Sequence, residues 1–338
     1  MPAVPQGQRS SQVPANAFRV LVTGFGPFSQ YVVNPSWLAV EPLQNTILHT
    51  DIHPKSATAL PAASAIPITK PRPIHITTLE VPVNYDDVLN IIPGVHARPP
   101  KLPADAPAEC APPPTKNYDF VFHIGVAGRG SLRMERQGHK LGYHMRDAKG
   151  KLAPVVRVSH KDFSRRDTES GLKLSGGLDG IDRLSITSGP SAAENMERER
   201  LGMDMVEGGD TLARPSRGFG IGYENFPDEI PTDIDVTRLV ADLKKGGVEQ
   251  IYTSMDAGHY LCDFIYYCSL AEVRRSTKPY EKRRHTQVLF LHCPPVDRPL
   301  STEEVTDAIK RIVVWVCSEQ QLDDAKDAVA QAAAAGIA

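Results

Sequence analysis

Short apolar strand patterns alternate with helix patterns along most of this chain. The strand patterns are brief runs of β-branched and aromatic residues, such as FRVLVT, YDFVFHI and QVLFLH, which suit buried strands. Strands that alternate with helices form α/β domains with a largely parallel sheet, and we predict that fold class. The predicted strands are Phe18–Thr23, Ile74–Val83, Tyr118–Ile124, Gln250–Thr253 and Gln287–His292, and the predicted helices are Trp37–Leu43, Tyr85–Ile92, Thr237–Lys245, Tyr260–Arg275 and Thr302–Gln320.

Proline and glycine are concentrated between these elements and indicate insertions. Fourteen of the 29 prolines lie between Pro54 and Pro114, and 12 of the 25 glycines lie between Gly150 and Gly222. Such segments do not sustain a helix or a strand ladder for long, so they indicate surface excursions. The chain is therefore predicted to hold one domain at 18–329, with insertions at about 45–73, 97–116 and 147–222. Residues 1–17 are predicted to be a disordered tail and 330–338 a C-terminal tail.

The charge balance excludes some functions. With 38 basic and 40 acidic side chains, the formal net charge is -2, which provides no basic field for a nucleic acid. No apolar run approaches the roughly 20 residues of a membrane span, and the start MPAVPQGQRSSQVPANAF lacks the features of a secretory signal. We therefore expect a cytoplasmic protein without nucleic-acid or membrane partners, whose five cysteines are reduced thiols rather than a disulfide framework.

Four polar or glycine-rich features follow predicted strands. They are GFGPF after Thr23, GVAGRG after Ile124, SMDAGHYLC after Thr253, and His292 at the end of its own strand. Ligands gather at the carboxyl ends of parallel strands. If the sheet is parallel throughout, all four features converge on one crevice.

Three residues from these segments are candidates for catalysis. Cys262 falls in the opening turn of a predicted helix, where the helix dipole favours a thiolate nucleophile. In VLFLHC, strand alternation places Val288, Phe290 and His292 on one face, and His292 is a candidate base. Glu135 is a candidate for the carboxylate that orients an imidazole. Each also has an ordinary use, as a buried thiol, a structural histidine and a solvated loop carboxylate, and position alone favours that use. The sequence positions of Cys268, Cys293 and Cys317 fit buried thiols without a chemical role.

Two other uses of these motifs are weaker. His259 and Cys262 have H-x-x-C spacing and His292 with Cys293 could add ligands, but adjacent strand residues point to opposite faces and no C-x-x-C pair exists. VLVTGFG is a poor dinucleotide fingerprint, because Pro27 follows at once and the third glycine is missing.

Six segments together resemble the pyroglutamyl peptidase I family of cysteine peptidases, also called pyrrolidone-carboxylate peptidases. They occur in that family's order and touch nearly every predicted element outside the insertions, and DAG-x-YLCDF is a highly specific signature. The segments are VLVTGFGPF with VNPSW, LEVPVNYDDV, HIGVAGRG, MERQGHKLGY, DAGHYLCDFIYYCSL and FLHCPP. Where the family frequently has Asn, five residues after its glutamate, this chain has Lys140.

The resemblance implies a site and a reaction. The family removes an N-terminal pyroglutamate (5-oxoproline) from peptides without a metal or an organic cofactor, and its members are cytosolic. Its fold is a three-layer α/β/α sandwich of the phosphorylase/hydrolase-like type, with a largely parallel, mixed and twisted sheet. Carried over by motif, Cys262 is the nucleophile, His292 the base and Glu135 the orienting acid. The implied substrate pocket is formed by Phe25 and Phe28, by backbone near Val126, and by Tyr260 and Leu261.

Two functional alternatives stay open at the level of sequence. The first is a catalytically silent protein that binds the lactam, with insertions that serve a protein partner. The second is a peptidase of the same mechanism that acts on another cyclic acyl group. The expected partners are small peptides with an N-terminal pyroglutamate, and the sequence does not indicate an oligomeric state.

Overall fold

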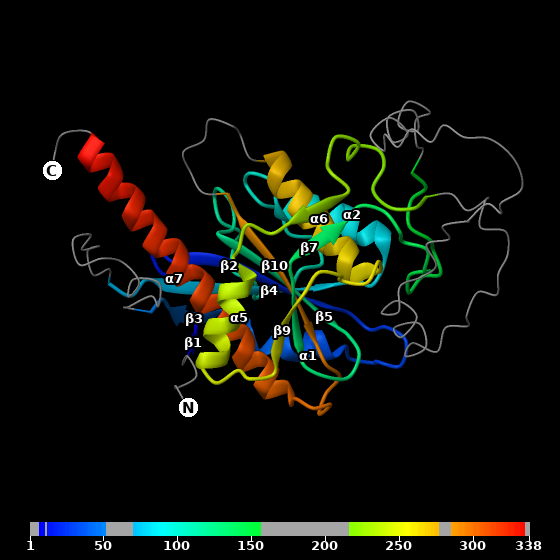
Figure 1. Cartoon of the computed structure of the whole chain (residues 1–338), viewed down its shortest axis with the longest axis horizontal. Helices are drawn as coiled ribbons and strands as arrows, with labels where there is room; N and C mark the ends of the chain where they lie inside the picture. The colour runs from blue at the N-terminus through cyan, green and yellow to red at the C-terminus, as the bar shows by residue number, and fades with distance from the viewer. Residues whose placement is uncertain (1–6, 11, 52–69, 157–215, 277–284, 335–338) are drawn as a thin grey trace, which may run out of the picture.

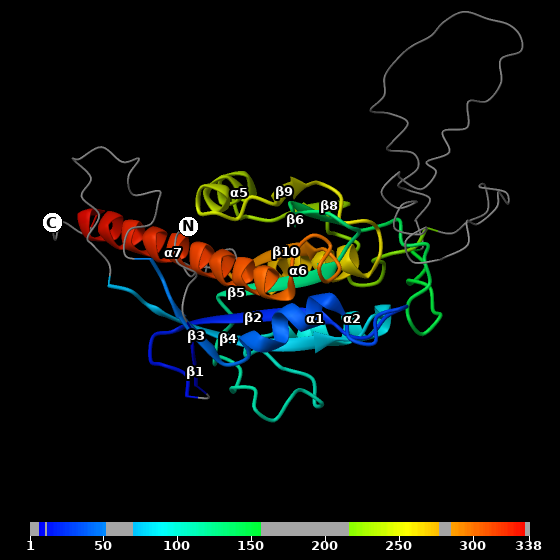
Figure 2. The same ribbon diagram turned by 90° about the horizontal axis from the view of Figure 1, so that it is seen from below.

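An eight-stranded sheet runs through the middle of the molecule. The computed structural model describes residues 7–10, 12–51, 70–156, 216–276 and 285–334. The strand order is β1-β3-β4-β2-β5-β10-β6-β9, which Figure 2 shows from β9 near the top to β1 near the bottom. These strands are β1 (Gln8–Arg9), β2 (Phe18–Phe25), β3 (Thr46–His49), β4 (Pro73–Val81), β5 (Phe120–Val126), β6 (Leu132–Glu135), β9 (Ile251–Ser254) and β10 (Gln287–Cys293). A separate two-stranded ribbon pairs β7 (Gln137–His139) with β8 (Glu229–Pro231).

The centre of the sheet is parallel and its edges are not. Strand β2 is parallel to β4 and β5, and β5 is parallel to β10. Strand β6 is antiparallel to β10, and β9 runs in the direction of β6. At the other edge β3 and β1 are added antiparallel. The predicted α/β fold with a largely parallel, mixed sheet is confirmed.

Helices cover both faces of the sheet, and Figure 1 shows α2 and α6 on one side with α1, α5 and α7 on the other. The helices are α1 (Pro35–Val40) with the short η1 (Glu41–Leu43), α2 (Tyr85–Val95), α5 (Val236–Lys245), α6 (Leu261–Ser276) and α7 (Thr302–Ala334). Three of these helices have an asparagine or aspartate at the N-cap. The side chain of each capping residue accepts a hydrogen bond from a backbone N–H of the first turn, which stabilises the start of the helix. The capping residues are Asn34, Asn84 and Asp235.

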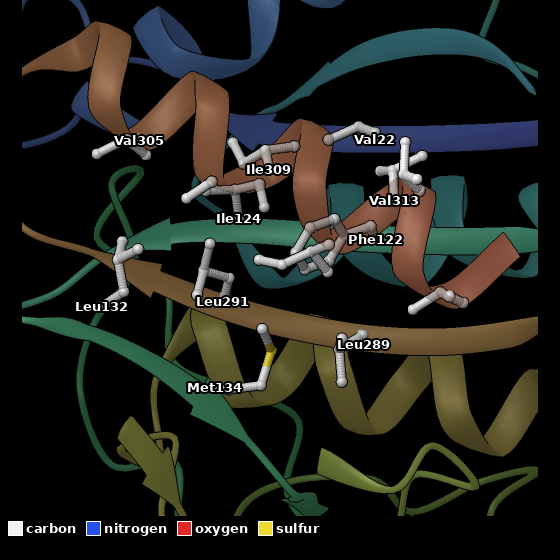
Figure 3. Close-up of a cluster of buried hydrophobic side chains, with 14 of the residues drawn as sticks. Val22, Phe122, Ile124, Leu132, Met134, Leu289, Leu291, Val305, Ile309 and Val313 are labelled. Atoms are coloured by element: carbon white, nitrogen blue, oxygen red, sulfur yellow. The ribbon is translucent and has the colours of Figure 1, made fainter. Parts of the chain in front are cut away.

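Strand alternation divides the buried side chains into two cores. On the α7 face, Phe122 and Ile124 of β5 pack with Ile309 and Val313, as Figure 3 shows. On the α6 face, residues of odd number in β2 and β5 and of even number in β10 pack with α2 and α6. The predicted alternation of VLFLHC is confirmed, since Phe290 belongs to the α6-face core and Leu289 and Leu291 to the other.

The five predicted strands and five predicted helices are all present, and the remaining strands were not predicted. Strand β1 lies in the tail predicted to be disordered, and it pairs with β3, at the start of the first predicted insertion. Both segments therefore belong to the sheet, which corrects these boundaries. Helix α7 reaches Ala334, well beyond the predicted Gln320, because the alanine-rich end keeps high helix propensity after the apolar pattern stops.

The predicted insertions are described only in part. Residues 52–69 and 157–215 lie outside the described residues. The ends of the third insertion pair with each other, because Val156 N donates to Ser216 O at 2.8 Å and Val155 forms a β-bridge with Arg217. The division into one domain with insertions stays a prediction. Among the helices that the structure describes, none has the length and apolar character needed to cross a bilayer.

Candidate active site

The candidate residues meet on the α6 face, where β5 and β10 end beneath the first turn of α6. Across the β5–β10 ladder His292 is paired with Gly125. One strand further along, β6 places Glu135 opposite Phe290. This antiparallel strand brings a carboxylate beside the parallel centre of the sheet.

His292 and Glu135 form a buried pair. His292 Nδ1 lies 2.7 Å from Glu135 Oε1, and the side chains are 5% and 0% exposed. Since a carboxylate only accepts, Nδ1–H donates this bond and, in the neutral ring, Nε2 carries the lone pair. The sequence indicated a polar loop for Glu135, and this is wrong: Glu135 ends strand β6 and is fully buried. Its Oε2 atom is buried and accepts no hydrogen bond in the described structure.

Cys262 is the second residue of α6, and its thiol lies directly over the sheet. A Cβ atom placed on Gly125 would be 2.8 Å from Cys262 Sγ and 2.7 Å from Phe290 Cζ. The thiol therefore occupies the space that a side chain at position 125 would fill, next to the ladder partner His292. The first hydrogen bond of α6 runs from Phe264 N to Tyr260 O, so Cys262 lies in the first turn, at the positive end of the dipole.

A tight loop delivers Cys262 to this position. Because β9 runs opposite to β2, β5 and β10, the condition of a parallel sheet is not met by β9, and its carboxyl end does not lie with theirs. The intervening residues cross over to α6. Asp256 Oδ1 accepts a hydrogen bond from Gly258 N at 2.8 Å. Gly258 and His259 then adopt positive φ angles of 84° and 30°, which turn the chain into the helix.

Aromatic side chains belong to the same core as Cys262. Phe25, Tyr260 and Leu261 belong to the buried core on this face, and Phe28 and Cys262 pack against it. The ring centroids of Phe28 and Tyr260 lie 5.6 Å apart. Ser36 Oγ accepts from Phe25 N at 3.0 Å and holds the end of β2 against α1. Of the predicted pocket residues, the structure places Phe28 and Tyr260 in ring contact and assigns Phe25 and Leu261 to the same core.

Val126 is the exception among the predicted pocket residues. Its side chain belongs to the core on the α7 face, because it follows Gly125 in the strand and alternation turns it away. Only the backbone of Val126 can contribute to the pocket, and backbone near Val126 is what the family resemblance implies.

Two hollows adjoin the loop after β2. One, of about 520 Å³, is lined by Phe28 together with Pro27, Ser29, Tyr31, Val32, Asp147 and Ala148. The other, of about 380 Å³, lies beside Pro27 and reaches Glu80, Asp105 and Lys149. Cys262 lines neither hollow, and the first gives Phe28 an open side.

Several supporting residues were not identified from the sequence. Gly125 is one, and its signal was the glycine at the end of an otherwise apolar strand. Tyr266 is another, whose hydroxyl donates to Glu135 O at 3.1 Å. Lys140, which stands where the family frequently has Asn, is buried and donates from Nζ to Glu224 O at 3.1 Å and to Phe226 O at 2.9 Å.

Three of the other cysteines have environments that favour the neutral thiol. Burial raises the pKa of Cys268 to about 12, and burial also raises the pKa of Cys317 well above its usual value. The pKa of Cys110 is raised too, mainly by burial. None of the five cysteines, all within the described residues, forms a disulfide.

Comparisons with known proteins agree on one group of relatives. A family model described as pyroglutamyl peptidase matches residues 18–65. Pyroglutamyl-peptidase 1 of Homo sapiens is 24% identical over 306 residues, covering 90% of each chain, and that of Mus musculus is 24% identical over 296 residues, covering 87% of each. The crystal structure of Bacillus amyloliquefaciens pyroglutamyl peptidase I aligns at 20% identity with a TM-score of 0.46, covering 88% of this chain and 95% of that one. A mutant pyrrolidone carboxyl peptidase from the hyperthermophile Pyrococcus furiosus aligns at 16% identity with a TM-score of 0.49, covering 89% of this chain and 99% of that one.

Proposed function

Because this chain is a distant member of the pyroglutamyl peptidase I family, we propose that it is a thiol peptidase that hydrolyses the amide bond after an N-terminal pyroglutamate. The observation that carries the proposal is the arrangement around Gly125. The Cys262 thiol lies over this glycine, and the glycine's ladder partner His292 is bound to Glu135 at 2.7 Å. A nucleophile, a base and a group that orients the base are the parts that covalent acyl transfer requires.

In the first half of the reaction Cys262 attacks the carbonyl that joins pyroglutamate to the next residue. Glu135 fixes the His292 proton on Nδ1, so Nε2 accepts the proton of the thiol. The positive end of the α6 dipole stabilises the thiolate and the negative charge that develops on the carbonyl oxygen. The amide C–N bond then breaks, His292 returns the proton to the departing amine, and a thioester on Cys262 remains.

In the second half of the reaction His292 activates water. Water loses a proton to Nε2 and attacks the thioester carbonyl, the C–S bond breaks, and pyroglutamate leaves while the thiol is restored. No step in this sequence passes through a metal or an organic cofactor.

The aromatic setting suits the proposed substrate. Pyroglutamate is a small, uncharged lactam ring with one N–H and one C=O, and the peptide that it caps has no free α-amine. Phe28 and Tyr260, 5.6 Å apart, offer flat apolar surfaces to the ring, and backbone groups near Val126 pair with its lactam edge. Proline lacks the lactam oxygen, and binding it leaves polar groups of the site unpaired, which disfavours it.

The experiment is a comparison of fluorogenic amides that carry the same leaving group. We expect the purified protein to release the fluorophore from pyroglutamyl amide with a kcat/KM at least about 100-fold above that for prolyl amide. Cys262→Ala should abolish release. Cys110→Ala is the matched control, because Cys110 is also partly exposed but lies outside the site, and it should retain activity. Undiminished turnover by Cys262→Ala, or equal turnover of the two amides, would overturn the proposal.

A further inference from the structure

A second cluster of polar side chains lies beside the first turn of α6. It consists of His139 in β7, His259 in the loop before α6, and Asp263 one residue after Cys262. Figure 1 shows β7 beside α6. The proposed peptidase reaction uses none of these three side chains.

The donor atoms of this cluster lie close together, somewhat further apart than the donors of an occupied metal site. Asp263 Oδ2 lies 3.3 Å from His139 Nδ1 and 3.7 Å from His259 Nδ1. One donor atom from each of the three residues lies within 4.8 Å of the others. In tetrahedral zinc sites, metal bonds of about 2.0–2.1 Å separate neighbouring donors by about 3.4 Å. Small side-chain rotations therefore suffice to close the three donors around one ion.

His259 gives an independent indication of a missing ligand. Its Nδ1 atom is buried and makes no hydrogen bond within the described structure, and its ion-pair contact with Asp263 Oδ2 is long, at 3.7 Å. The His259 ring packs closely against the backbone of Gly142, which has a φ angle of 109°. A Cβ atom at position 142 would lie only 2.8 Å from His259 Nδ1, so only glycine leaves room for the ring. A buried nitrogen without a hydrogen bond is destabilising, and a bound cation would supply the interaction that is missing.

The electrostatic environment favours a cation. Asp263 is fully buried and adjoins His139, whose side chain is 14% exposed. The carboxylates of Asp263, Asp256 and Glu229 place negative charge around His139. The ammonium group of the adjacent Lys140 is directed to the carbonyls of Glu224 and Phe226 instead.

The surroundings also orient the donors. The Tyr143 hydroxyl donates to Asp263 Oδ2 at 2.9 Å, and the Gln137 carboxamide contacts His139 Nε2 at 3.3 Å. When Nδ1 of His139 binds a metal, its remaining proton moves to Nε2, where a rotated Gln137 carboxamide offers its oxygen. Partners of this kind fix the tautomer and the ring orientation of ligating histidines.

We propose that His139, His259 and Asp263 bind one divalent transition-metal cation of the zinc class, with water as the fourth ligand. Two imidazoles and a carboxylate are a donor set for zinc rather than for magnesium, which prefers oxygen ligands. The ion joins β7, the loop and α6, so it stabilises the fold and fixes the helix start that carries Cys262. The inference does not rest on the proposed peptidase activity, and it revises the expectation from the sequence that the chain holds no metal.

Calorimetric titration of the metal-free, untagged full-length protein with ZnCl₂ tests the proposal. All titrations use protein that carries Cys262→Ser, because the Cys262 thiol and His292 could otherwise bind zinc themselves. We expect one Zn²⁺ per chain, a higher melting temperature in its presence, and no such effect of Mg²⁺. His259→Asn should weaken zinc binding at least tenfold, since asparagine tolerates a positive φ but supplies no imidazole.

Two controls separate this result from nonspecific binding. His49→Asn changes an exposed histidine of β3 and should leave the affinity unaltered. Asp263→Asn should also abolish the zinc-dependent rise in melting temperature, and circular dichroism reports whether that variant folds. Equal zinc affinity of His259→Asn and its background, or zinc binding that is lost with Cys262→Ser alone, would overturn the proposal.

Discussion

Gly125 determines how closely the proposed nucleophile approaches the sheet. Every other side chain at this position begins with a Cβ that would meet Cys262 Sγ at 2.8 Å and Phe290 Cζ at 2.7 Å. The restriction is steric, because the φ angle of Gly125 is not in the left-handed region. The absence of one methyl group therefore positions the thiol beside His292.

Replacing Gly125 by alanine should impair catalysis more than folding. The added methyl displaces the thiol or the Phe290 ring, and a misplacement of about 1 Å at a reacting centre costs on the order of 100-fold in rate. Overpacking costs about 1–3 kcal/mol of stability. Measurement of kcat/KM and of the melting temperature checks this. Gly220→Ala is the control, since its Cβ would have no contact closer than 3.7 Å, and it should leave both unchanged. Full activity in Gly125→Ala would contradict the account.

In the proposed mechanism Glu135 orients His292, and this role can be tested separately from that of the nucleophile. In Glu135→Gln the amide keeps the shape of the side chain but can present N–H to Nδ1, which favours the wrong tautomer of the imidazole. We expect kcat/KM to fall by about 100-fold or more, while alkylation of Cys262 by iodoacetamide still occurs. An unchanged kcat/KM would remove Glu135 from the proposed mechanism.

Position made Cys262 and His292 candidates, at a helix start and a strand end, and the family resemblance then implied their roles. The sequence could not identify the surroundings of Glu135, because LRME alternates apolar and polar residues, a pattern that predicts an exposed face for Arg133 and Glu135. The burial of Glu135 results from pairing with β10 and β9 on either side, which is long-range information. The Val126 backbone was predicted for the pocket from the resemblance, and alternation explains why its side chain faces elsewhere.

Between elements, helices α2 and α6 meet through a buried polar contact. His96, the residue that caps the end of α2, lies with Nε2 2.6 Å from Ser269 Oγ of α6. Burial lowers the pKa of His96 to about 3, and burial and the charge of His96 lower that of His123 in β5 to about 3. Both rings are therefore neutral in the folded protein at neutral pH.

The neutral histidines make stability depend on pH. Their folded pKa values lie below the unfolded value of about 6.5, so the unfolded chain binds more protons at acid pH. Above pH 6.5 these two histidines should not change the free energy of unfolding with pH. Below pH 6.5 the free energy of unfolding should fall as the pH drops towards 3, and at pH 5 each histidine should have lowered it by about 2 kcal/mol. Urea unfolding at pH 7.5 and 5 measures the difference.

The His96→Gln variant tests the assignment of this effect, because glutamine can still bond to Ser269 but does not titrate. Its loss of stability between pH 7.5 and 5 should be smaller by about 2 kcal/mol. His49→Gln, which changes an exposed histidine, should behave as the wild type. An identical pH dependence in His96→Gln would show that His96 is not the responsible group.

For the whole molecule, the alternation of strand and helix patterns predicted the layers but not the directions of all strands. The central strands β2, β4, β5 and β10 follow the expected parallel arrangement. Strand β6 is inserted antiparallel between β10 and β9, so the chain reaches the start of α6 by a crossing loop rather than directly from a parallel strand. Strand direction depends on which distant segments pair, and local residue patterns contain no such information.

The paired ends of the third insertion indicate that the catalytic unit closes without the segment between them. Val156 N and Ser216 O are 2.8 Å apart, and Gly218 N donates to Pro154 O at 2.9 Å. Replacing residues 157–215 by a short Gly–Ser linker should therefore leave the melting temperature within a few degrees, with kcat/KM for a pyroglutamyl amide within about threefold. Loss of turnover in a variant that melts normally would instead assign the segment a part in the reaction.

The central claim is that Cys262 is a nucleophile placed beside a pocket for pyroglutamate. The most direct measurement is mass spectrometry of the full-length protein after incubation with pyroglutamyl chloromethyl ketone, a reagent that alkylates a thiol with loss of chloride once the lactam is bound. The account predicts one adduct per chain, located on Cys262, and much slower labelling by the prolyl analogue. Labelling on another residue, or equal rates for the two reagents, would contradict it.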